Sequence, residues 1–157
     1  MVTQIVIPSR GVISLEYMVL DVNGTIALDG QIIPGVDERL DRLGELLDLW
    51  LVSADTQGTL ASLAAGLQVQ TRLLQPGDEA AQKAALVEEL GPRRVVAIGN
   101  GANDEAMLRL AALGIAVMGN EGLAVACLNA ADVMVPDIGS ALDLLLWPRR
   151  LIATLRT

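Results

Sequence analysis

The chain has 157 residues, of which 52% are hydrophobic, and it carries a formal net charge of −8 with a sequence pI near 4.4. This length suits one domain with a proper core, and the acidic balance argues against nucleic acid or an anionic membrane as the main partner. The lack of histidine excludes Ser-His catalysis and His-ligated zinc, and a single cysteine, Cys127, excludes an intrachain disulfide. We interpret Cys127 as a small buried hydrophobe. With no leader-like amino terminus and no apolar stretch of about 18 residues, a cytoplasmic protein without a membrane span is expected.

The first third of the chain predicts short strands and turns. Residues 2–7 read as a strand that is closed by a turn at 8–11 and forms an edge pair with the strand ending at Asp21. Residues 26–33 predict a small hairpin flap with Asp29 and Gly30 as its turn. Asn23-Gly24 between apolar flanks would by itself also favour a hairpin. The competing interpretation is that Asp21 ends a central strand that is buried on both faces.

Helices alternate with strands from residue 34 onward. The expected strands are 49–53, 69–74, 95–98, 115–118 and 132–135. Helices are expected between them, with Asp78 capping a helix over 79–90 and a helical carboxy-terminal segment that is interrupted at Pro148. This alternation predicts a Rossmann-like three-layer α/β/α fold with a mostly parallel central sheet. No repeat, linker or low-complexity segment is visible, so a single domain over 1–157 is expected, with 1–15 as an amino-terminal strand and turn.

Polar residues gather at three predicted strand ends, at 21–25, 53–56 and 99–104, and ligands of such sheets bind outside the carboxyl ends of the strands. Lys83 lies on the helix before the third of these strands. A lone helix lysine is usually a solvated charge, but Lys83 is the only lysine beside ten arginines. An ammonium and a guanidinium are not interchangeable at a tight phosphate site. We therefore favour a functional role for Lys83. Taken alone, Ser53 would read as a strand-terminal or capping serine, and Asp104 as a charge that favours the dipole of its helix.

A family resemblance rests on four of these features in order: Asp-Val-Asn-Gly-Thr at 21–25, Ser53 after an apolar strand, the isolated Lys83, and Gly-Asn-Gly-Ala-Asn-Asp at 99–104. Together they resemble the haloacid-dehalogenase (HAD) superfamily, and within it small soluble relatives of the phosphorylation domain of P-type ATPases. The resemblance covers about residues 15–157. It implies a HAD-like fold and a Mg²⁺-dependent phosphohydrolase that works through an aspartyl phosphate on Asp21.

The resemblance also implies a role for each matching position. The catalytic residues would be Asp21, Asn23, Ser53 and Lys83. The phosphate would be bound by Ser53, Ala54, Lys83 and Asn103. The Mg²⁺ ion would be held by Asp21, the backbone carbonyl of Asn23, Asn100 and Asp104, an all-oxygen set of the kind that magnesium prefers.

Two asparagines depart from the pattern. Asn23 stands where most phosphatases of the superfamily carry a general acid and base, and its amide should slow phosphoenzyme hydrolysis by about 10²–10⁴. Asn100 replaces the first aspartate of the last motif, which removes an anionic metal ligand. There is also no room for a cap domain between residues 25 and 83. An uncapped site suits a large phosphate ester, or closure by a second subunit, and the mean hydropathy of +0.48 favours a homo-oligomer.

Two further interpretations remain. One is a catalytically weakened regulatory or binding module that holds Mg²⁺ and phosphate, or a partner protein. Asn23 and Asn100 favour it. The intact Asp21, Ser53, Lys83 and Asp104 oppose it. The other is a flavodoxin-like or receiver-type domain, which shares the sheet and an acidic pocket but predicts neither the Asn-Gly-Thr after Asp21 nor the motif at 99–104.

Overall fold

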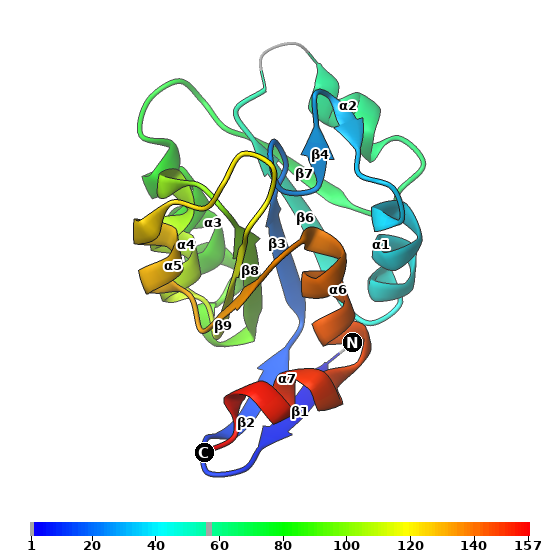
Figure 1. The fold of residues 1–157 in the computed structure, drawn as a ribbon. Helices are drawn as coiled ribbons and strands as arrows, with labels where there is room; N and C mark the ends of the chain where they lie inside the picture. Colours follow the sequence, from blue (N-terminus) through cyan, green and yellow to red (C-terminus); the bar gives the residue numbers. More distant parts are fainter. Residues whose placement is uncertain (1, 56–57) are drawn as a thin grey trace.

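A computed structural model describes residues 2–55 and 58–157 (Figure 1). At its centre is a sheet of six parallel strands in the order β10-β9-β8-β3-β6-β7. These strands are β3 (Tyr17–Asp21), β6 (Asp48–Ser53), β7 (Gln70–Leu73), β8 (Val95–Gly99), β9 (Leu113–Val117) and β10 (Val133–Val135). The predicted parallel sheet is confirmed, and β3, which ends at Asp21, lies inside it between β6 and β8.

Helices cover both faces of the sheet (Figure 1). One face carries α1 (Val36–Gly44), α2 (Thr59–Ala64) and α6 (Ile138–Leu146), and the other carries α3 (Glu79–Leu90), α4 (Glu105–Leu110) and α5 (Val125–Ala130). Side chains of β3 alternate between these layers, because successive residues of a strand point to opposite faces. Met18 and Leu20 join the core beneath α1 and α6, whereas Val19 joins the core beneath α3 and α4. The predicted three-layer α/β/α architecture is therefore confirmed.

The amino-terminal strand does not pair with the strand that ends at Asp21, and that prediction was wrong. Instead β1 (Thr3–Ile7) pairs antiparallel with β2 (Gly11–Leu15) in a separate two-stranded sheet. The chain reverses through Ser9, whose φ of 66° lies in the left-handed region. The inner face of the hairpin packs against α7 (Pro148–Leu155), and its buried apolar residues are Ile5, Ile7 and Leu15. Helix α7 follows α6 after a break at Pro148, as predicted.

The predicted flap is present as the short hairpin of β4 (Ala27–Leu28) and β5 (Gln31–Ile32). Asp29 and Gly30 both have positive φ, 52° and 79°, as a two-residue turn of type I′ requires. The structure also contains two short 3₁₀ helices, η1 (Pro92–Arg94) and η2 (Ala102–Asp104). Cys127 is fully buried, and burial raises the pKa of its thiol to about 12. Among the described helices, none is long and apolar enough to cross a membrane.

Candidate active site

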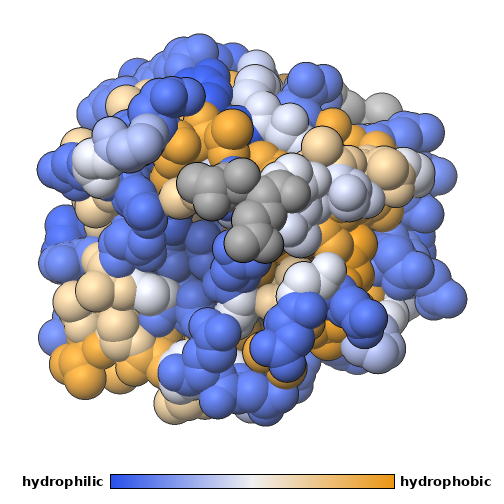
Figure 2. Space-filling model, turned by 90° about the horizontal axis from the view of Figure 1, so that it is seen from above, coloured by the Kyte–Doolittle hydropathy of each residue, from blue (hydrophilic) through white to orange (hydrophobic). Residues whose placement is uncertain are grey.

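The carboxyl ends of three neighbouring strands meet at one edge of the sheet. Asp21 ends β3, Ser53 ends β6, and Asn100 directly follows β8. Because β6 and β8 flank β3, these three residues from distant parts of the chain open into one pocket of about 670 Å³. Figure 2 looks down on this edge and shows a hollow that is surrounded largely by hydrophilic residues. The parallel order of the strands therefore gathers the predicted polar clusters in one place.

The pocket lining contains every predicted site residue except Asp104. The predicted members of the lining are Asp21, Asn23, Ser53, Ala54, Lys83, Asn100 and Asn103. Thr56, the last residue of the predicted polar strand end at 53–56, lies outside the described residues. Asp104 is fully buried beneath the pocket. Separate stretches of the sequence thus build one site, and Asp104 supports it from below.

Lys83 is the electrostatic centre of the site. Its side chain is only 2% exposed, and its Nζ donates to Asp21 Oδ1 at 2.9 Å and to Asp104 Oδ1 at 2.7 Å. Helix α3, which Asp78 caps through a hydrogen bond from the backbone N–H of Ala81, carries this ammonium into the interior. Removing one partner of such a buried ion pair typically costs about 3–5 kcal/mol, because it leaves an uncompensated charge. The only lysine of the chain therefore binds the aspartate at the end of the central strand.

Asp104 has no oxygen open to the pocket. Its Oδ2 accepts the backbone N–H groups of Asn100 and Gly101, each at 3.0 Å, while Oδ1 accepts from Lys83. A Cβ on Gly99 would lie only 2.5 Å from the Asp104 carboxylate, so glycine is needed at that position. In this arrangement Asp104 orients Lys83 and the 100–101 backbone. The prediction that Asp104 is a direct metal ligand would require it to release one of these donors.

The ionisation of Asp21 reflects its burial. Burial raises the pKa of Asp21 to about 6, and the nearby Asp104 adds to this, while Lys83 and a hydrogen bond from Thr25 oppose it. For Lys83, burial acts to lower the pKa, but Asp21 and Asp104 outweigh burial and the pKa is raised. The ammonium therefore remains charged and holds a carboxylate that ionises in the mildly acidic range.

Thr25 connects the first and last motifs, a role that the sequence did not predict. Its Oγ1 lies 3.2 Å from Asp21 Oδ2 and 3.1 Å from Asn100 Oδ1. The amide of Asn100 in turn donates to the carbonyl of Gly24 at 3.2 Å. Thr25 is 1% exposed, so these contacts lie in the floor of the site. They fix the loop after β3 against the loop after β8.

The phosphate-binding candidates also have defined partners. Ser53 Oγ accepts the backbone N–H of Asp55 at 3.1 Å and lies 3.5 Å from Asn23 Nδ2, which leaves its own proton for a ligand in the pocket. Asp55 also accepts the N–H of Leu60 at the start of α2. Asn103 Nδ2 donates to Glu79 Oε2 at 2.8 Å. Ser53 is therefore well placed to donate to a phosphoryl oxygen, whereas the amide of Asn103 already has a partner.

Sequence reasoning gave no role to two acidic residues of the lining, Glu79 and Glu121. Glu79 opens α3, and Glu121 lies in the loop after β9, whose carboxyl end reaches the same edge of the sheet. That shared strand-end position was the available signal for Glu121. The described residues contain no cluster of three or more His, Cys, Asp or Glu side chains that could hold a metal. A metal here would depend on carbonyl and amide oxygens as well as carboxylates.

Comparison with known sequences finds relatives that match only part of this chain. No protein-family model matches the chain. It is 45% identical over 84 residues to the uncharacterized protein MJ0073 of Methanocaldococcus jannaschii, a match that covers 51% of this chain and 90% of that protein. It is 29% identical over 131 residues to the copper-transporting ATPase ccc2 of Schizosaccharomyces pombe, which covers 75% of this chain but only 14% of the transporter. The sequence therefore resembles a small part of a P-type pump.

Several solved structures resemble this chain over most of its length. A chain from Streptomyces avermitilis described as a HAD-family hydrolase has a TM-score of 0.63 at 24% identity, covering 90% of this chain and 84% of that one. The 3-deoxy-D-manno-octulosonate 8-phosphate phosphatase of Moraxella catarrhalis, in complex with magnesium, phosphate and the sugar KDO, has a TM-score of 0.68 at 19% identity, with coverages of 90% and 94%. The catalytic domain of the CPx-ATPase CopB-B has a TM-score of 0.56 at 28% identity, with coverages of 73% and 45%.

The fold and the motifs at the sheet edge resemble those of HAD-family hydrolases. The chain has the fold of HAD-family hydrolases, and it is similar in sequence and structure to the catalytic domain of P-type ATPases. The resemblance deduced from the four motifs is thereby confirmed.

Proposed function

We propose that this chain is a Mg²⁺-dependent phosphohydrolase that acts through an aspartyl phosphate on Asp21. The observation that carries the proposal is the placement of Asp21 at the end of the central strand, open to the pocket and held by the buried ammonium of Lys83. Phosphoryl transfer depends mainly on positioning and on neutralising charge. Both are supplied here by residues whose positions are fixed by the sheet and by α3.

In the proposed first step, a carboxylate oxygen of Asp21 attacks the phosphorus of a phosphate ester. The phosphorus–oxygen bond to the alcohol breaks, and the leaving alkoxide takes a proton from water, because the amide of Asn23 has none to give. Ser53 donates a hydrogen bond to a phosphoryl oxygen, and Lys83 offsets the negative charge. In the second step, water attacks the phosphorus, a proton is lost to solvent, and phosphate leaves while the Asp21 carboxylate is restored.

The donor set fits a magnesium ion only in part. The Asp21 carboxylate, the carbonyl of Asn23 and the side-chain oxygen of Asn100 would hold it, and oxygen donors are the ones that Mg²⁺ prefers. Asp104 is engaged elsewhere, so these residues supply a single carboxylate. When bound, the ion would neutralise developing charge on the phosphoryl oxygens. We expect a weak Mg²⁺ site unless another anionic group contributes.

The substrate would be a phosphate ester that enters an open pocket. Between β3 and β6 the chain forms only the β4–β5 hairpin and α1, and between β6 and α3 the described residues form only α2 and β7. This arrangement supports the expectation of an uncapped site, which suits a macromolecular ester or closure by a second copy of the chain. A cytoplasmic homo-oligomer remains part of the proposal.

The test is hydrolysis of a panel of phosphate esters with Mg²⁺ and with a chelator. We expect slow, Mg²⁺-dependent turnover by the wild type and background rates for Asp21→Asn. Asp41→Asn, which removes the same charge from an exposed position on α1, should behave as the wild type. Equal turnover by the wild type and Asp21→Asn would refute the proposal.

One observation favours a second candidate, a binding or regulatory module with little hydrolysis. Asn23 is exposed to the pocket and lines it with an amide, so no acid stands over the phosphorylation site. A Mg²⁺-dependent beryllofluoride complex of the wild type, absent in Asp21→Asn and accompanied by no turnover of any ester, would favour this candidate. Measurable turnover would exclude it.

A further inference from the structure

The loop at residues 118–124 brings a second open carboxylate to the pocket. Glu121 lies in the lining beside Asn100, and its carboxylate occupies the space directly over Gly24. A Cβ built on Gly24 would collide with Glu121 Oε2, and it would lie 2.8 Å from Glu121 Cδ and 3.2 Å from Asn100 Nδ2. The φ of 76° at Gly24 favours glycine, and the absence of a Cβ there leaves the space that the Glu121 carboxylate occupies. The Glu121 carboxylate thus lies at the junction of the two loops that carry the expected metal ligands.

The backbone on both sides of Glu121 is fastened to that junction. The N–H of Gly122 donates to the carbonyl of Gly119 at 3.0 Å, which closes a tight turn around Glu121. The N–H of Ala124 donates to the carbonyl of Asn100 at 2.9 Å. On the other side, a Cβ on Gly119 would lie 3.3 Å from the carbonyl oxygen of Gly24. The turn is therefore packed on the loops after β3 and β8, and Glu121 projects from a fixed support.

The expected metal ligands carry too little negative charge, and the carboxylate of Glu121 could supply more. Asp21 shares Lys83 with Asp104, and Asn23 and Asn100 are neutral. Glu121 forms no hydrogen bond or ion pair with the described residues, and its exposed side chain lines the pocket, where its oxygens are accessible to a ligand. Cations that are bound through oxygen, such as Mg²⁺, favour sites with several anionic donors. The exposed carboxylate of Glu121 lies beside the neutral amide of Asn100, an expected metal ligand, and would attract such a cation.

We propose that Glu121 supplies the second carboxylate of the Mg²⁺ site, in place of the one that Asn100 lacks. This inference rests on the proposed function, since it concerns the metal of the same site. It makes Glu121 a ligand contributed by the loop after β9, the strand that follows the last motif. The alternative role for an exposed loop glutamate is that of a solvated surface charge, which would leave metal affinity unchanged.

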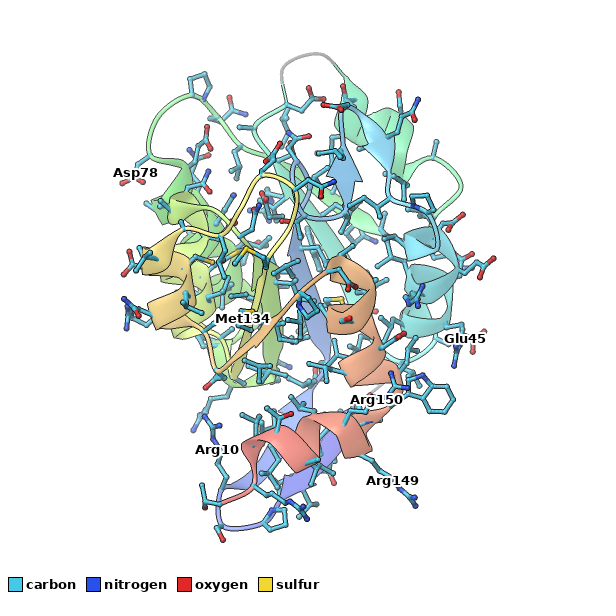
Figure 3. The ribbon with its side chains drawn as sticks, in the orientation of Figure 1. Arg10, Glu45, Asp78, Met134, Arg149 and Arg150 are labelled. Atoms are coloured by element: carbon cyan, nitrogen blue, oxygen red, sulfur yellow. The ribbon has the colours of Figure 1, made fainter. Side chains whose placement is uncertain are left out.

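The test measures metal binding directly, without substrate. Mn²⁺, a paramagnetic ion that accepts the same oxygen ligands, is titrated into the protein and the free ion is followed by electron paramagnetic resonance, with Mg²⁺ as competitor. We expect Glu121→Gln to weaken Mn²⁺ binding by about tenfold or more, since even outer-shell partners of a metal are typically worth about 10–100-fold. The matched control is Glu45→Gln, which removes the same charge at the exposed end of α1 (Figure 3).

A gain-of-ligand variant makes the test two-sided. Asn100→Asp should tighten binding, and Asn100→Asp with Glu121→Gln should return affinity toward that of the wild type. Thermal unfolding of each variant with chelator verifies that it is folded. The proposal is overturned if Glu121→Gln binds Mn²⁺ as tightly as Glu45→Gln. If turnover is nevertheless Mg²⁺-dependent and lost in Asp21→Asn, the proposed function stands without it. A wild type that binds no Mn²⁺ would reject both the role of Glu121 and the Mg²⁺ dependence.

Discussion

At the scale of single residues, we propose that the amide of Asn23 limits the rate at which a phosphoryl group on Asp21 is released. Asn23 is exposed to the pocket and lies 3.5 Å from Ser53 through its Nδ2, close to where a leaving group would depart. A carboxylic acid at this position could protonate the leaving oxygen and later deprotonate water, whereas an amide can do neither. Under the proposed mechanism, the site therefore lacks the group that would speed release of the phosphoryl group from Asp21.

The substitution Asn23→Asp tests this limit. We expect turnover of a phosphate ester with Mg²⁺ to rise by about 10²-fold or more, in line with the usual contribution of general acid–base catalysis. Asn23→Ala is the control, since it removes the amide without adding an acid and should not raise the rate. Initial rates with a chromogenic ester are the measurement. A rise in both variants, or in neither, would contradict the role assigned to this position.

The buried Asp21 predicts a pH dependence of stability in metal-free protein. Its pKa in the folded state, about 6, lies above the ordinary value of 3.8, so the folded protein holds the proton more tightly than the unfolded chain. Its contribution is therefore fully present below pH 4 and is lost as the pH rises through 6, by about 3 kcal/mol at most. With chelator present, the free energy of unfolding of the wild type should fall relative to Asp21→Asn between pH 4 and 7. Parallel curves would contradict it.

At the scale of elements, the β1–β2 hairpin and α7 form a small layer beyond the amino-terminal ends of the main sheet's strands, opposite the pocket (Figure 3). Arg10 connects the hairpin to Asp132 at 2.7 Å, and Leu151 of α7 is fully buried. The sequence did not predict this layer. The turn at 8–10 reverses the chain through Ser9, a non-glycine residue with positive φ. The segment 11–15 is too short to predict a strand by itself, and the helix that packs on the hairpin, α7, comes from the other end of the chain.

A cavity at Leu151 should show how much this layer contributes. We expect Leu151→Ala to lower the free energy of unfolding by about 2–5 kcal/mol, as other large-to-small core changes do. Thr154→Ala, on the exposed face of the same helix, should change it by about 0.5 kcal/mol or less. Chemical denaturation followed by circular dichroism measures both. Similar values for the two variants would show that α7 does not stabilise the hairpin.

At the scale of the whole molecule, the sequence predicts those features of the site that follow from the order of the strands. It does not predict the features that depend on contacts between loops. Parallel strands bring their carboxyl ends to one edge, so Asp21, Ser53 and the loop at 99–104 were expected to converge. Two contacts cannot be read from the local sequence pattern. One is the binding of Asp104 to Lys83 and two backbone N–H groups, and the other is the approach of Glu121 to Gly24. Both arise from the packing of one loop on another.

Formation of an aspartyl phosphate on Asp21 is the central claim, and it can be measured directly. The protein is mixed with a radiolabelled phosphate ester and Mg²⁺, quenched in acid, and analysed for labelled protein. On the proposal that Asn23 slows release, we predict that label accumulates on the wild type, is removed by hydroxylamine as acyl phosphates are, and is absent from Asp21→Asn. Turnover without any labelled wild-type protein, or equal labelling of Asp21→Asn, would contradict the account.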